Sequence, residues 1–315
     1  MDLLKELQGS KNIVISGHVR PDGDCIGSVM GTYLYLKKAM PYATIIPMIE
    51  QPAKEFEIIK DIADIKSDFK ADIEEVDSFV GLDCSTLDRF GDAVAYYEKA
   101  KKTIIIDHHI SNDGFGDVSL VDGGCSSASE LVFSCMDESF IDTEIAKALY
   151  IGIIHDTGVM QYSNTKSETL MAVAKLISFG FDFPAIITET FYEKTKLQND
   201  MLGIGITNSK MVLDGKVMTS VIDKSTMDKM GANAHDLDGI INQLLNTKGV
   251  EAAVLMHELE DGMFKISMRS KGKVDVARIA KEFDGGGHVR AAGFSLNGTS
   301  DEILDKVMKA IGSQI

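Results

Sequence analysis

Short apolar runs alternate with helical patterns over the first half of the chain. Four runs have the length and composition of buried strands: Ile13–Ile15, Thr44–Ile49, Ser78–Leu82 and Thr103–Ile106. Apolar residues at helical spacing separate them, first from Ile26 to Leu36 and again over Ala53–Ile65. Because strands alternate with helices and Ile104–Ile106 is apolar throughout, the pattern predicts a doubly wound, mostly parallel α/β sheet.

Further helices are expected behind this sheet. A helix should begin near Cys125–Glu130, where serines can cap it, and three more fit Ile141–Ile154, Ser167–Phe179 and Pro184–Tyr192. Asp142 or Thr143 is well placed to cap the second of these helices.

A second pattern follows a polar stretch and predicts a smaller α/β domain. Strands are expected at Met211–Leu213, Val217–Val221, Ala252–Met256, Met263–Met268 and Phe294–Leu296, with hairpin turns at Asp214-Gly215 and Asp261-Gly262. Helices are expected at Leu237–Leu245, Val276–Phe283 and Asp301–Ile311. The interpretation is a domain at 1–192, a linker at 193–210 and a second domain at 211–315.

Histidines and aspartates cluster where the predicted strands of the first domain end. The first strand is followed by His18, Asp22 and Asp24, the third by Asp83, and the fourth by Asp107, His108 and His109. Asp156 ends a predicted helix beside a glycine. The carboxyl ends of parallel strands lie along one edge of a sheet, where ligands of such folds bind, so we expect these side chains to converge.

The residue types in this cluster suit divalent cations. Imidazole and carboxylate together favour manganese, cobalt or zinc. Taken alone, the first group is also compatible with a solvated turn and helix-capping aspartates. Together, two histidines and four carboxylates are too many ligands for one open metal. They suit two cations roughly 3.5–4 Å apart, which activate a water and neutralise charge on a phosphoryl oxygen.

The second domain offers groups that suit a nucleotide. Lys265, Ser267 and Arg269 share one face of a predicted strand, which by itself is compatible with an ordinary solvated face. Three glycines then precede His288, more than a helix end requires, and backbone amides at Gly286 and Gly287 can approach a phosphate closely. His155 is interpreted as a packing residue, and His235 and His257 as ordinary surface or strand residues.

Composition narrows the function classes. The 315 residues carry 32 basic and 48 acidic side chains, a net charge of −16, which disfavours long nucleic acid and anionic membranes as partners. No apolar run approaches a membrane span, and the N-terminus lacks the pattern of a signal peptide. The four cysteines form no C-x-x-C pair and are expected to be reduced, in a cytoplasmic protein. The chain has no nucleoside-triphosphate P-loop motif, no G-x-S-x-G and no H-E-x-x-H.

These motifs, in this order, resemble those of the DHH phosphoesterase superfamily. H-x-x-x-D-x-D at His18–Asp24, the isolated Asp83, Asp107-His108-His109 and Asp156-Thr157-Gly158 match its four metal motifs. GGGHVRAAG at Gly285–Gly293 resembles the signature of the DHH-associated C-terminal domain of RecJ-like members. The resemblance covers nearly the whole chain, and its length is most similar to the bacterial oligoribonuclease (nanoRNase) and pAp phosphatase group.

The resemblance implies a role for each residue. His18 and Asp22 would bind one metal, Asp24, His108 and Asp156 the other, and Asp83 would bridge them. Asp107 would orient a ligand histidine, and His109 would contact the scissile phosphate or protonate the leaving oxygen. Arg269, Gly286, Gly287 and His288, with Ser267 and Ser270 as weaker candidates, would hold the far nucleotide, so the active site should lie in the cleft between the domains. Manganese is expected, with cobalt or magnesium as alternatives.

The expected function is metal-dependent hydrolysis of very short RNA and of 3′-phosphoadenosine 5′-phosphate (pAp). Alternatives within the superfamily are the dinucleotide pApA or a cyclic-dinucleotide pathway and, because of the glycine run, less favourably pyrophosphate. A nucleotide-binding protein without turnover is the alternative outside enzymes, and the intact ligand set argues against it. An exposed sheet edge would permit a homodimer.

Overall fold

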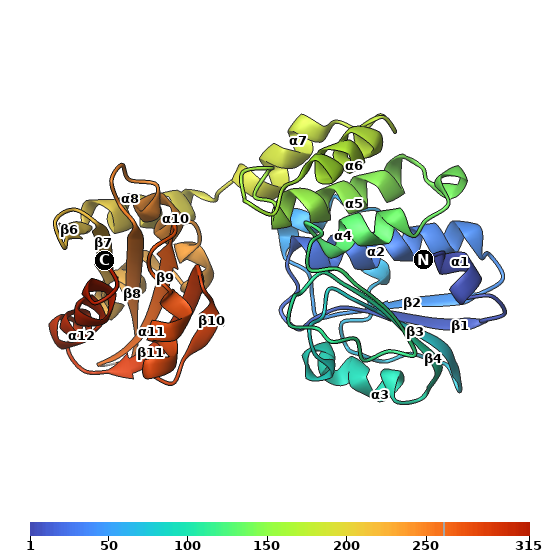
Figure 1. Cartoon of the computed structure of the whole chain (residues 1–315), viewed down its shortest axis with the longest axis horizontal. Coiled ribbons are helices and arrows are strands. Elements are labelled where there is room, and N and C mark those ends of the chain that lie inside the picture. The colour runs from blue at the N-terminus through green and yellow to red at the C-terminus, as the bar shows by residue number, and fades with distance from the viewer. Residues whose placement is uncertain (261) are drawn as a thin grey trace. The chain divides into compact units, whose positions relative to one another are not determined.

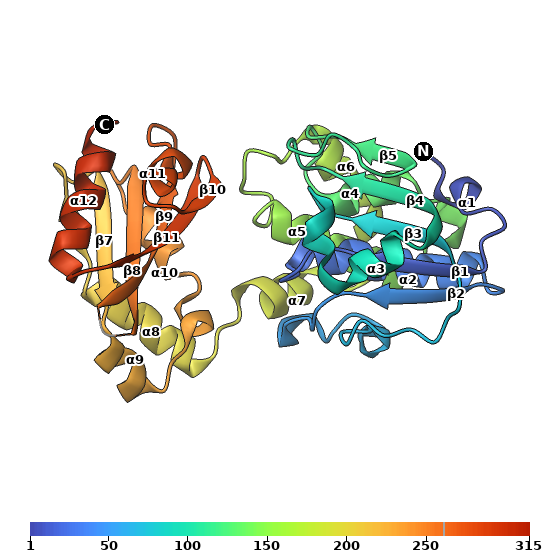
Figure 2. The ribbon, with the colours of Figure 1, turned by 90° about the horizontal axis from the view of Figure 1, so that it is seen from below.

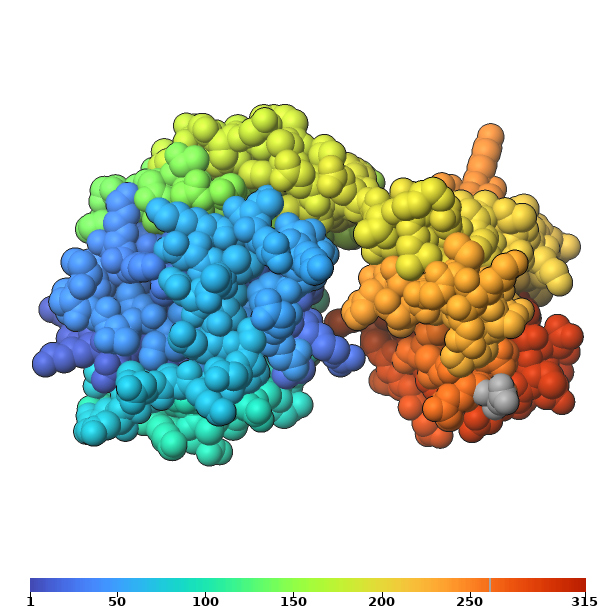
Figure 3. Space-filling model, turned by 180° about the vertical axis from the view of Figure 1, so that it is seen from behind, coloured from blue at the N-terminus to red at the C-terminus, as the bar shows by residue number. Residues whose placement is uncertain are grey.

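The computed structural model describes residues 1–260 and 262–315; residue 261 is drawn in grey in Figure 3. Within these residues the chain divides into two compact units, Met1–Glu193 and Lys194–Ile315. The turn predicted at Asp261-Gly262 includes residue 261, which is not among the described residues.

The first unit is built on a parallel sheet of five strands in the order β2-β1-β3-β4-β5 (Figure 2). The strands are β1 (Asn12–Ser16), β2 (Thr44–Met48), β3 (Val76–Leu82), β4 (Ala100–Asp107) and β5 (Val118–Val121). The predicted doubly wound parallel sheet is therefore confirmed. Strand β5 was not predicted, because it is a short edge strand with no fully buried residue.

Helices cover both faces of this sheet (Figure 1). The larger layer contains α2 (Gly23–Ala39), α4 (Ala128–Ser134), α5 (Thr143–Asp156), α6 (Ser167–Ile177) and α7 (Phe183–Ile187), which a π-helical turn, Thr188–Tyr192, extends. The opposite face carries a 3₁₀ segment, Leu87–Ala93, and α3 (Val94–Tyr97), around an aromatic cluster that includes Phe79 and Phe90. A short α1 (Leu3–Glu6) and a 3₁₀ turn, Glu138–Phe140, complete the unit.

Two glycines allow α2 and α5 to pack unusually closely. A Cβ added at Gly27 would lie 2.6 Å from the backbone nitrogen of Gly152. A Cβ added at Gly152 would fall on the Ser129 hydroxyl and lie 2.9 Å from Oδ1 of Asp24. This close approach brings Asp24, near the start of α2, next to the helix whose last residue is Asp156.

The helix predicted over Ala53–Ile65 is wrong. This stretch contains two single 3₁₀ turns, Lys54–Phe56 and Ile62–Asp64, and Asp61 between them has a left-handed backbone (φ 57°) that interrupts a helix. Phe56 and Ile59 still pack into the core, so the apolar spacing reflected burial and not a continuous helix.

The second unit is a mixed sheet of six strands in the order β10-β11-β9-β8-β7-β6. Its strands are β6 (Lys210–Val212), β7 (Val217–Ile222), β8 (Ala252–Glu260), β9 (Met263–Ser270), β10 (Gly286–His288) and β11 (Ala291–Asn297). Helices α11 (Val276–Glu282) and α12 (Ser300–Gly312) pack on one face, and α8 (Lys196–Thr207) and α10 (Ile240–Leu245) on the other. A helix α9 (Lys224–Met230) and a 3₁₀ turn, Ala234–Leu237, connect β7 to α10.

Two stretches of this unit differ from the expected elements. Most of 193–210, interpreted from sequence as a linker, is the helix α8, which a Thr195–Gln198 capping box starts. The glycine run after α11, for which no strand was predicted, enters the edge strand β10, which pairs with β11. Helix α8 was not predicted because its sequence is largely polar. Strand β10 was not predicted because glycine has a poor strand propensity.

No helix among the described residues is long and apolar enough to cross a membrane. All four cysteines are free thiols.

Candidate metal centre

Loops at the carboxyl ends of three neighbouring strands supply most of the predicted ligands. His18 follows β1, Asp83 follows β3 directly, and Asp107 ends β4 ahead of His108 and His109. Because β1, β3 and β4 are adjacent and parallel, these loops emerge at the same edge of the sheet. The convergence expected from the sequence is therefore present.

Asp83 lies at the middle of the cluster. Its Oδ2 is 3.4 Å from Nε2 of His18, and its Oδ1 is 3.6 Å from both Nε2 of His108 and Nδ1 of His109. The residue is almost completely buried, and its backbone is left-handed (φ 50°), a conformation that aspartate tolerates better than most residues. Oδ2 of Asp83 thus faces His18, and Oδ1 faces His108 and His109.

The two remaining groups of ligands flank Asp83. Asp22 lies 3.6 Å from Nε2 of His18, whose Nδ1 donates to the Val19 carbonyl and so leaves Nε2 directed into the cluster. On the other side, Nε2 of His108 is 3.5 Å from Asp156 and 3.9 Å from Asp24.

Helix starts hold two of the carboxylates in place. Asp22 caps α2 by accepting from the backbone N–H groups of Asp24 and Cys25. Asp24, fully buried, accepts from the backbone of Ala128 at 2.6 Å and of Ser129 at 2.9 Å, at the first turn of α4. The amide groups satisfy this buried charge and fix its orientation.

The cluster carries more negative charge than it can hold alone. Burial raises the pKa of Asp24 well above its usual value, and burial raises that of Asp156 to about 6, with Asp83 adding to both shifts. Burial alone would lower the pKa of His18 and His108, but the facing carboxylates raise both to about 10. The site therefore attracts positive charge.

These residues fit divalent cations. Asp24, His108 and Asp156 form one group, and Asp83, His108 and His109 another, each offering ligand atoms within 4.8 Å of one another. Oδ1 of Asp83 is buried without a hydrogen-bond partner, a costly state that a cation would relieve. Cys25 is also near His18 and Asp83, but burial raises the pKa of its thiol well above the usual value, consistent with a packing role.

Two asparagines that the sequence analysis did not select support the site. Asn112 donates from Nδ2 to Oδ2 of Asp107 at 2.7 Å and to the Cys84 carbonyl at 3.0 Å. Asn164 donates from Nδ2 to the carbonyl of Asp156 at 3.0 Å, and its Oδ1 is buried without a partner. Neither residue has a spacing signal, because each contacts groups brought together only by the fold.

Asp107 contacts a different histidine from the one expected. Its Oδ1 accepts from Nδ1 of His109 at 2.7 Å and from the backbone of His108 at 2.9 Å, so it holds the ring of His109 and only the backbone of the ligand histidine. His155, interpreted as packing, lies between Phe56 and Phe191, and burial lowers its pKa to about 4.

The candidate substrate residues of the second unit share a face of its sheet. Strand pairing aligns Arg269 with Ala291 and His288, and Ser267 with Gly293 and Gly286. Gly287 alternates to the other face, and Ser270 is buried against the Val274 carbonyl. Added Cβ atoms at Gly285 and Gly287 would strike β11, whereas nothing lies within 4 Å of one at Gly286.

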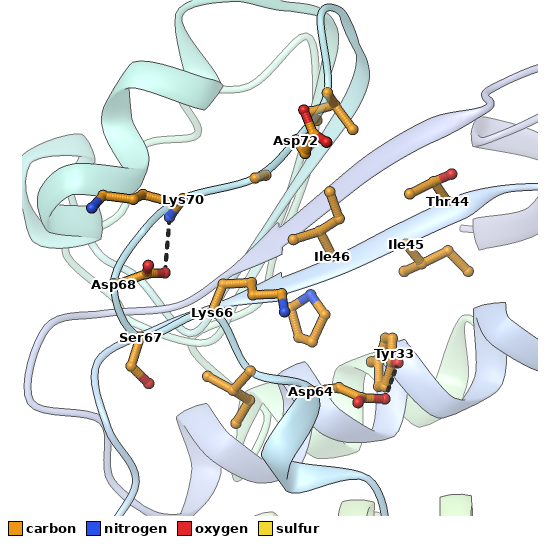
Figure 4. Close-up of a pocket in the computed structure, with 14 residues that line it drawn as sticks. Tyr33, Thr44, Ile45, Ile46, Asp64, Lys66, Ser67, Asp68, Lys70 and Asp72 are labelled. Carbon is orange, nitrogen blue, oxygen red and sulfur yellow. Dashed lines mark hydrogen bonds between the residues drawn. The ribbon is translucent and has the colours of Figure 1, made fainter.

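A recess of about 980 Å³ lies in the first unit, along the edge strand β2 (Figure 4). Tyr33, Thr44 and Lys66 line it, and the Tyr33 hydroxyl donates to Asp64. None of the predicted site residues takes part, so the recess is separate from the metal cluster.

Two domain families match the chain. Residues 12–153 match the DHH family, N-terminal domain, and residues 214–315 match the DHHA1 domain. The chain therefore contains a DHH N-terminal domain followed by a DHHA1 domain. The resemblance seen in the sequence motifs is thereby confirmed.

Relatives of this DHH chain cover nearly its whole length. It is 28% identical over 301 residues to a Bacillus subtilis protein named bifunctional oligoribonuclease and PAP phosphatase NrnA, covering 94% of this chain and 92% of that protein. A Thermus thermophilus protein of the same name is 27% identical, covering 100% and 93%. A Bacteroides fragilis structure described as an exopolyphosphatase-related protein superposes with a TM-score of 0.90 at 27% identity, covering 99% of this chain and 94% of that one.

Proposed function

We propose that this DHH–DHHA1 chain is a metal-dependent phosphoesterase that degrades short oligoribonucleotides to mononucleotides and converts pAp to AMP. The position of Asp83, buried and facing a different histidine with each oxygen, is the observation that carries the chemistry. The names of the two bacterial relatives supply the substrate class.

We assign the residues to two cation positions that would share Asp83. His18 and Asp22 would hold one cation, and Asp24, His108 and Asp156 the other, with manganese expected ahead of cobalt or magnesium. Two cations in such a site activate a water and neutralise charge on the phosphoryl group. Asp24 contributes from a fixed orientation because α4 holds both of its oxygens.

His109, held by Asp107, would supply the proton for the leaving oxygen. Asp107 holds His109 through Nδ1, so Nε2 is the nitrogen that can deliver a proton to the leaving oxygen. Asp107 is fully buried and hydrogen-bonded, which fixes the ring without competing for the substrate.

The second unit would bind the far end of the substrate. Arg269, Ser267 and His288 lie on one face, where a guanidinium and an imidazole suit a phosphate. Gly286 has the open space that lets the backbone approach a ligand, whereas Gly285 and Gly287 serve strand packing. We therefore favour Gly286 for the contact, and the contact of Gly287 stays a prediction.

The overall charge of −16 supports a short substrate over a long polyanion. The free cysteines agree with a cytoplasmic location, which belongs to this proposal together with the manganese preference and the homodimer. The likeness to a Vibrio pGpG-specific phosphodiesterase, with a TM-score of 0.54 at 11% identity, is a likeness of fold. A dinucleotide is therefore included among the substrates of the test below.

The test is manganese-dependent turnover of a 5′-labelled RNA pentamer, pAp, pApA and pyrophosphate at equal concentration. Release of mononucleotides from the pentamer and of phosphate from pAp supports the proposal. Turnover of pApA alone would replace short RNA by a signalling dinucleotide, and turnover of pyrophosphate alone would refute the assignment of the second unit.

A pair of matched variants tests the metal centre. Asp83→Asn removes the shared charge and should lower turnover about 100- to 1,000-fold, in line with the ~2.7–4 kcal/mol effects of losing one charge-stabilising group. Asp305→Asn makes the same change at an exposed position on α12 and should leave turnover unchanged. Equal activity of the two variants would show that Asp83 has no part in the reaction.

A further inference from the structure

Asn112 occupies a buried position between the ends of β3 and β4. Its side-chain amide makes two donor bonds, to Oδ2 of Asp107 at 2.7 Å and to the carbonyl of Cys84 at 3.0 Å. Its Oδ1 accepts from the backbone of Gly114 at 2.7 Å. The side chain is 6% exposed, so these bonds replace those to water.

The three partners fix which way the amide points. Asp107 and the Cys84 carbonyl can only accept, and the Gly114 N–H can only donate. The reversed amide would place an oxygen against two acceptors and a nitrogen against a donor. Asn112 therefore has one satisfied orientation, and its two hydrogens both go to active-site loops.

The first hydrogen acts on His109 through Asp107. With Oδ2 held by Asn112, the other oxygen of Asp107 is directed at Nδ1 of His109, 2.7 Å away, and at the backbone of His108. Because a carboxylate only accepts, Nδ1 carries the hydrogen, and Nε2 is left for the substrate. A carboxylate that orients an imidazole is a recurrent arrangement, and the amide here orients that carboxylate.

The second hydrogen acts on the loop of Asp83. Cys84 is the next residue, and Asp83 has the left-handed backbone that aims its carboxylate at the histidines. One side chain thus ties the loop of the shared carboxylate to the loop of His109, whose Nδ1 is 3.6 Å from Oδ1 of Asp83.

We propose that Asn112 is a positioning residue for the reaction, which holds the Asp107–His109 pair so that His109 protonates the leaving oxygen. In that step the P–O bond to the leaving group breaks, its electron pair stays on the oxygen, and the oxygen takes the Nε2 proton of the His109 imidazolium, which is left as the neutral ring with its hydrogen on Nδ1. The Nδ1 hydrogen stays on His109, donated to Oδ1 of Asp107, throughout. This role rests on the proposed phosphoesterase function but adds a residue to it.

Asn112→Asp is the sharpest perturbation, because it keeps the volume and the acceptor for Gly114 but replaces both donor bonds by carboxylate repulsion. We expect kcat for the RNA pentamer to fall about 10- to 100-fold, as for other losses of alignment, with KM within about twofold. Asn233→Asp is the matched control, since Asn233 lies on an exposed turn and its side chain accepts from the His235 backbone. Its kinetics should equal those of the wild type.

Two readouts separate positioning from a general structural role. A nucleoside 4-nitrophenyl phosphate ester needs no proton on its leaving group, so Asn112→Asp should hydrolyse it within about threefold of the wild type. Manganese affinity should fall less than kcat, because no proposed ligand is replaced. Equal losses on both substrates, or a loss of metal affinity as large as the loss in kcat, would overturn the proposal.

A measurement without turnover distinguishes this inference from the proposed function. In ¹⁵N-histidine spectra of the folded protein, identified by the signal missing from His109→Gln, the ring of His109 should carry its hydrogen on Nδ1. That signal should broaden or shift in Asn112→Asp and in the uncharged variant Asn112→Ser, which serves if the first fails to fold. An unchanged His109 signal in the folded variant refutes the positioning role, whereas inactivity of the wild type towards RNA refutes only the proposed substrate.

Discussion

Replacing Gly152 with alanine should separate α5 from the metal cluster. The added Cβ would lie 2.7 Å from the Cβ of Ser129 and 2.9 Å from Oδ1 of Asp24. No rotamer of Ser129 moves its Cβ, so the backbones must separate by about 0.7 Å to reach an ordinary contact of about 3.4 Å. All three residues lie in a fully packed helix layer, which leaves little room to adjust.

The expected cost follows from this geometry. Overpacking in a core costs about 1–3 kcal/mol, and the better helix propensity of alanine returns about 0.5–1 kcal/mol of it. Unfolding of the first unit in urea should therefore show a net loss of about 1–2 kcal/mol. Because Asp24 is bonded to the start of α4 and Asp156 ends α5, manganese affinity by calorimetry should also fall about tenfold.

Two further variants serve as controls for Gly152→Ala. Gly203→Ala, at an exposed position inside α8 with nothing within 4 Å, should leave metal affinity unchanged and stabilise its unit slightly. Adding Ser129→Gly to Gly152→Ala removes the obstructing Cβ and should restore metal affinity. If Gly152→Ala binds manganese as tightly as the wild type, the close approach of α2, α4 and α5 does not set the ligand geometry.

Three other outcomes follow from the structure. Backbone N–H groups at the start of β1 and a lysine ammonium lower the pKa of Asp77 from 3.8 to about 2. The charge of Asp77 therefore stabilises the folded state above pH about 4, and this contribution is lost as the pH falls through about 2. Asp77→Asn should therefore cost about 1–2 kcal/mol in urea unfolding at pH 7, and a gap that stays constant down to pH 2 would refute the linkage. Manganese binding should release protons, because carboxylates raise the pKa of His18 and His108 to about 10 in the metal-free site. Calorimetry in buffers of different ionisation enthalpy measures the proton release, and equal heats of binding in all buffers would contradict the prediction. Gly286→Ala should raise KM for RNA without changing stability, whereas Gly287→Ala should destabilise the second unit, since its Cβ would strike β11; the reverse pattern would refute the assignment.

The motif residues could be placed from sequence because of how parallel sheets are built. A ligand at the end of β1, β3 or β4 needs only its strand to be recognised, and buried apolar strands are the strongest local signal in this chain. His18, Asp83 and His108 were therefore expected at one edge, and they lie there.

What could not be predicted depends on contacts between distant segments. Asn112 is significant only because Cys84 and Asp107 meet around its amide, and no spacing along the chain encodes that. The packing role of the glycine run could not be predicted for the same reason: an added Cβ at Gly285 or Gly287 would strike β11, which passes close to both. The helix missed at α8 has a polar, glycine-containing sequence whose apolar residues contact a core formed by later strands.

The backbone at Asp83 separates the fold of this chain from its chemistry. The left-handed conformation there suits asparagine as well as aspartate, so the turn itself does not require a charged side chain. Burial alone would raise the pKa of the Asp83 carboxyl, but the facing His108 and His18 lower it below its usual value, so the fold favours this charge before any cation binds. An asparagine at this position would keep the turn and remove the charge that the histidines face, so one substitution leaves the backbone in place and abolishes the shared carboxylate.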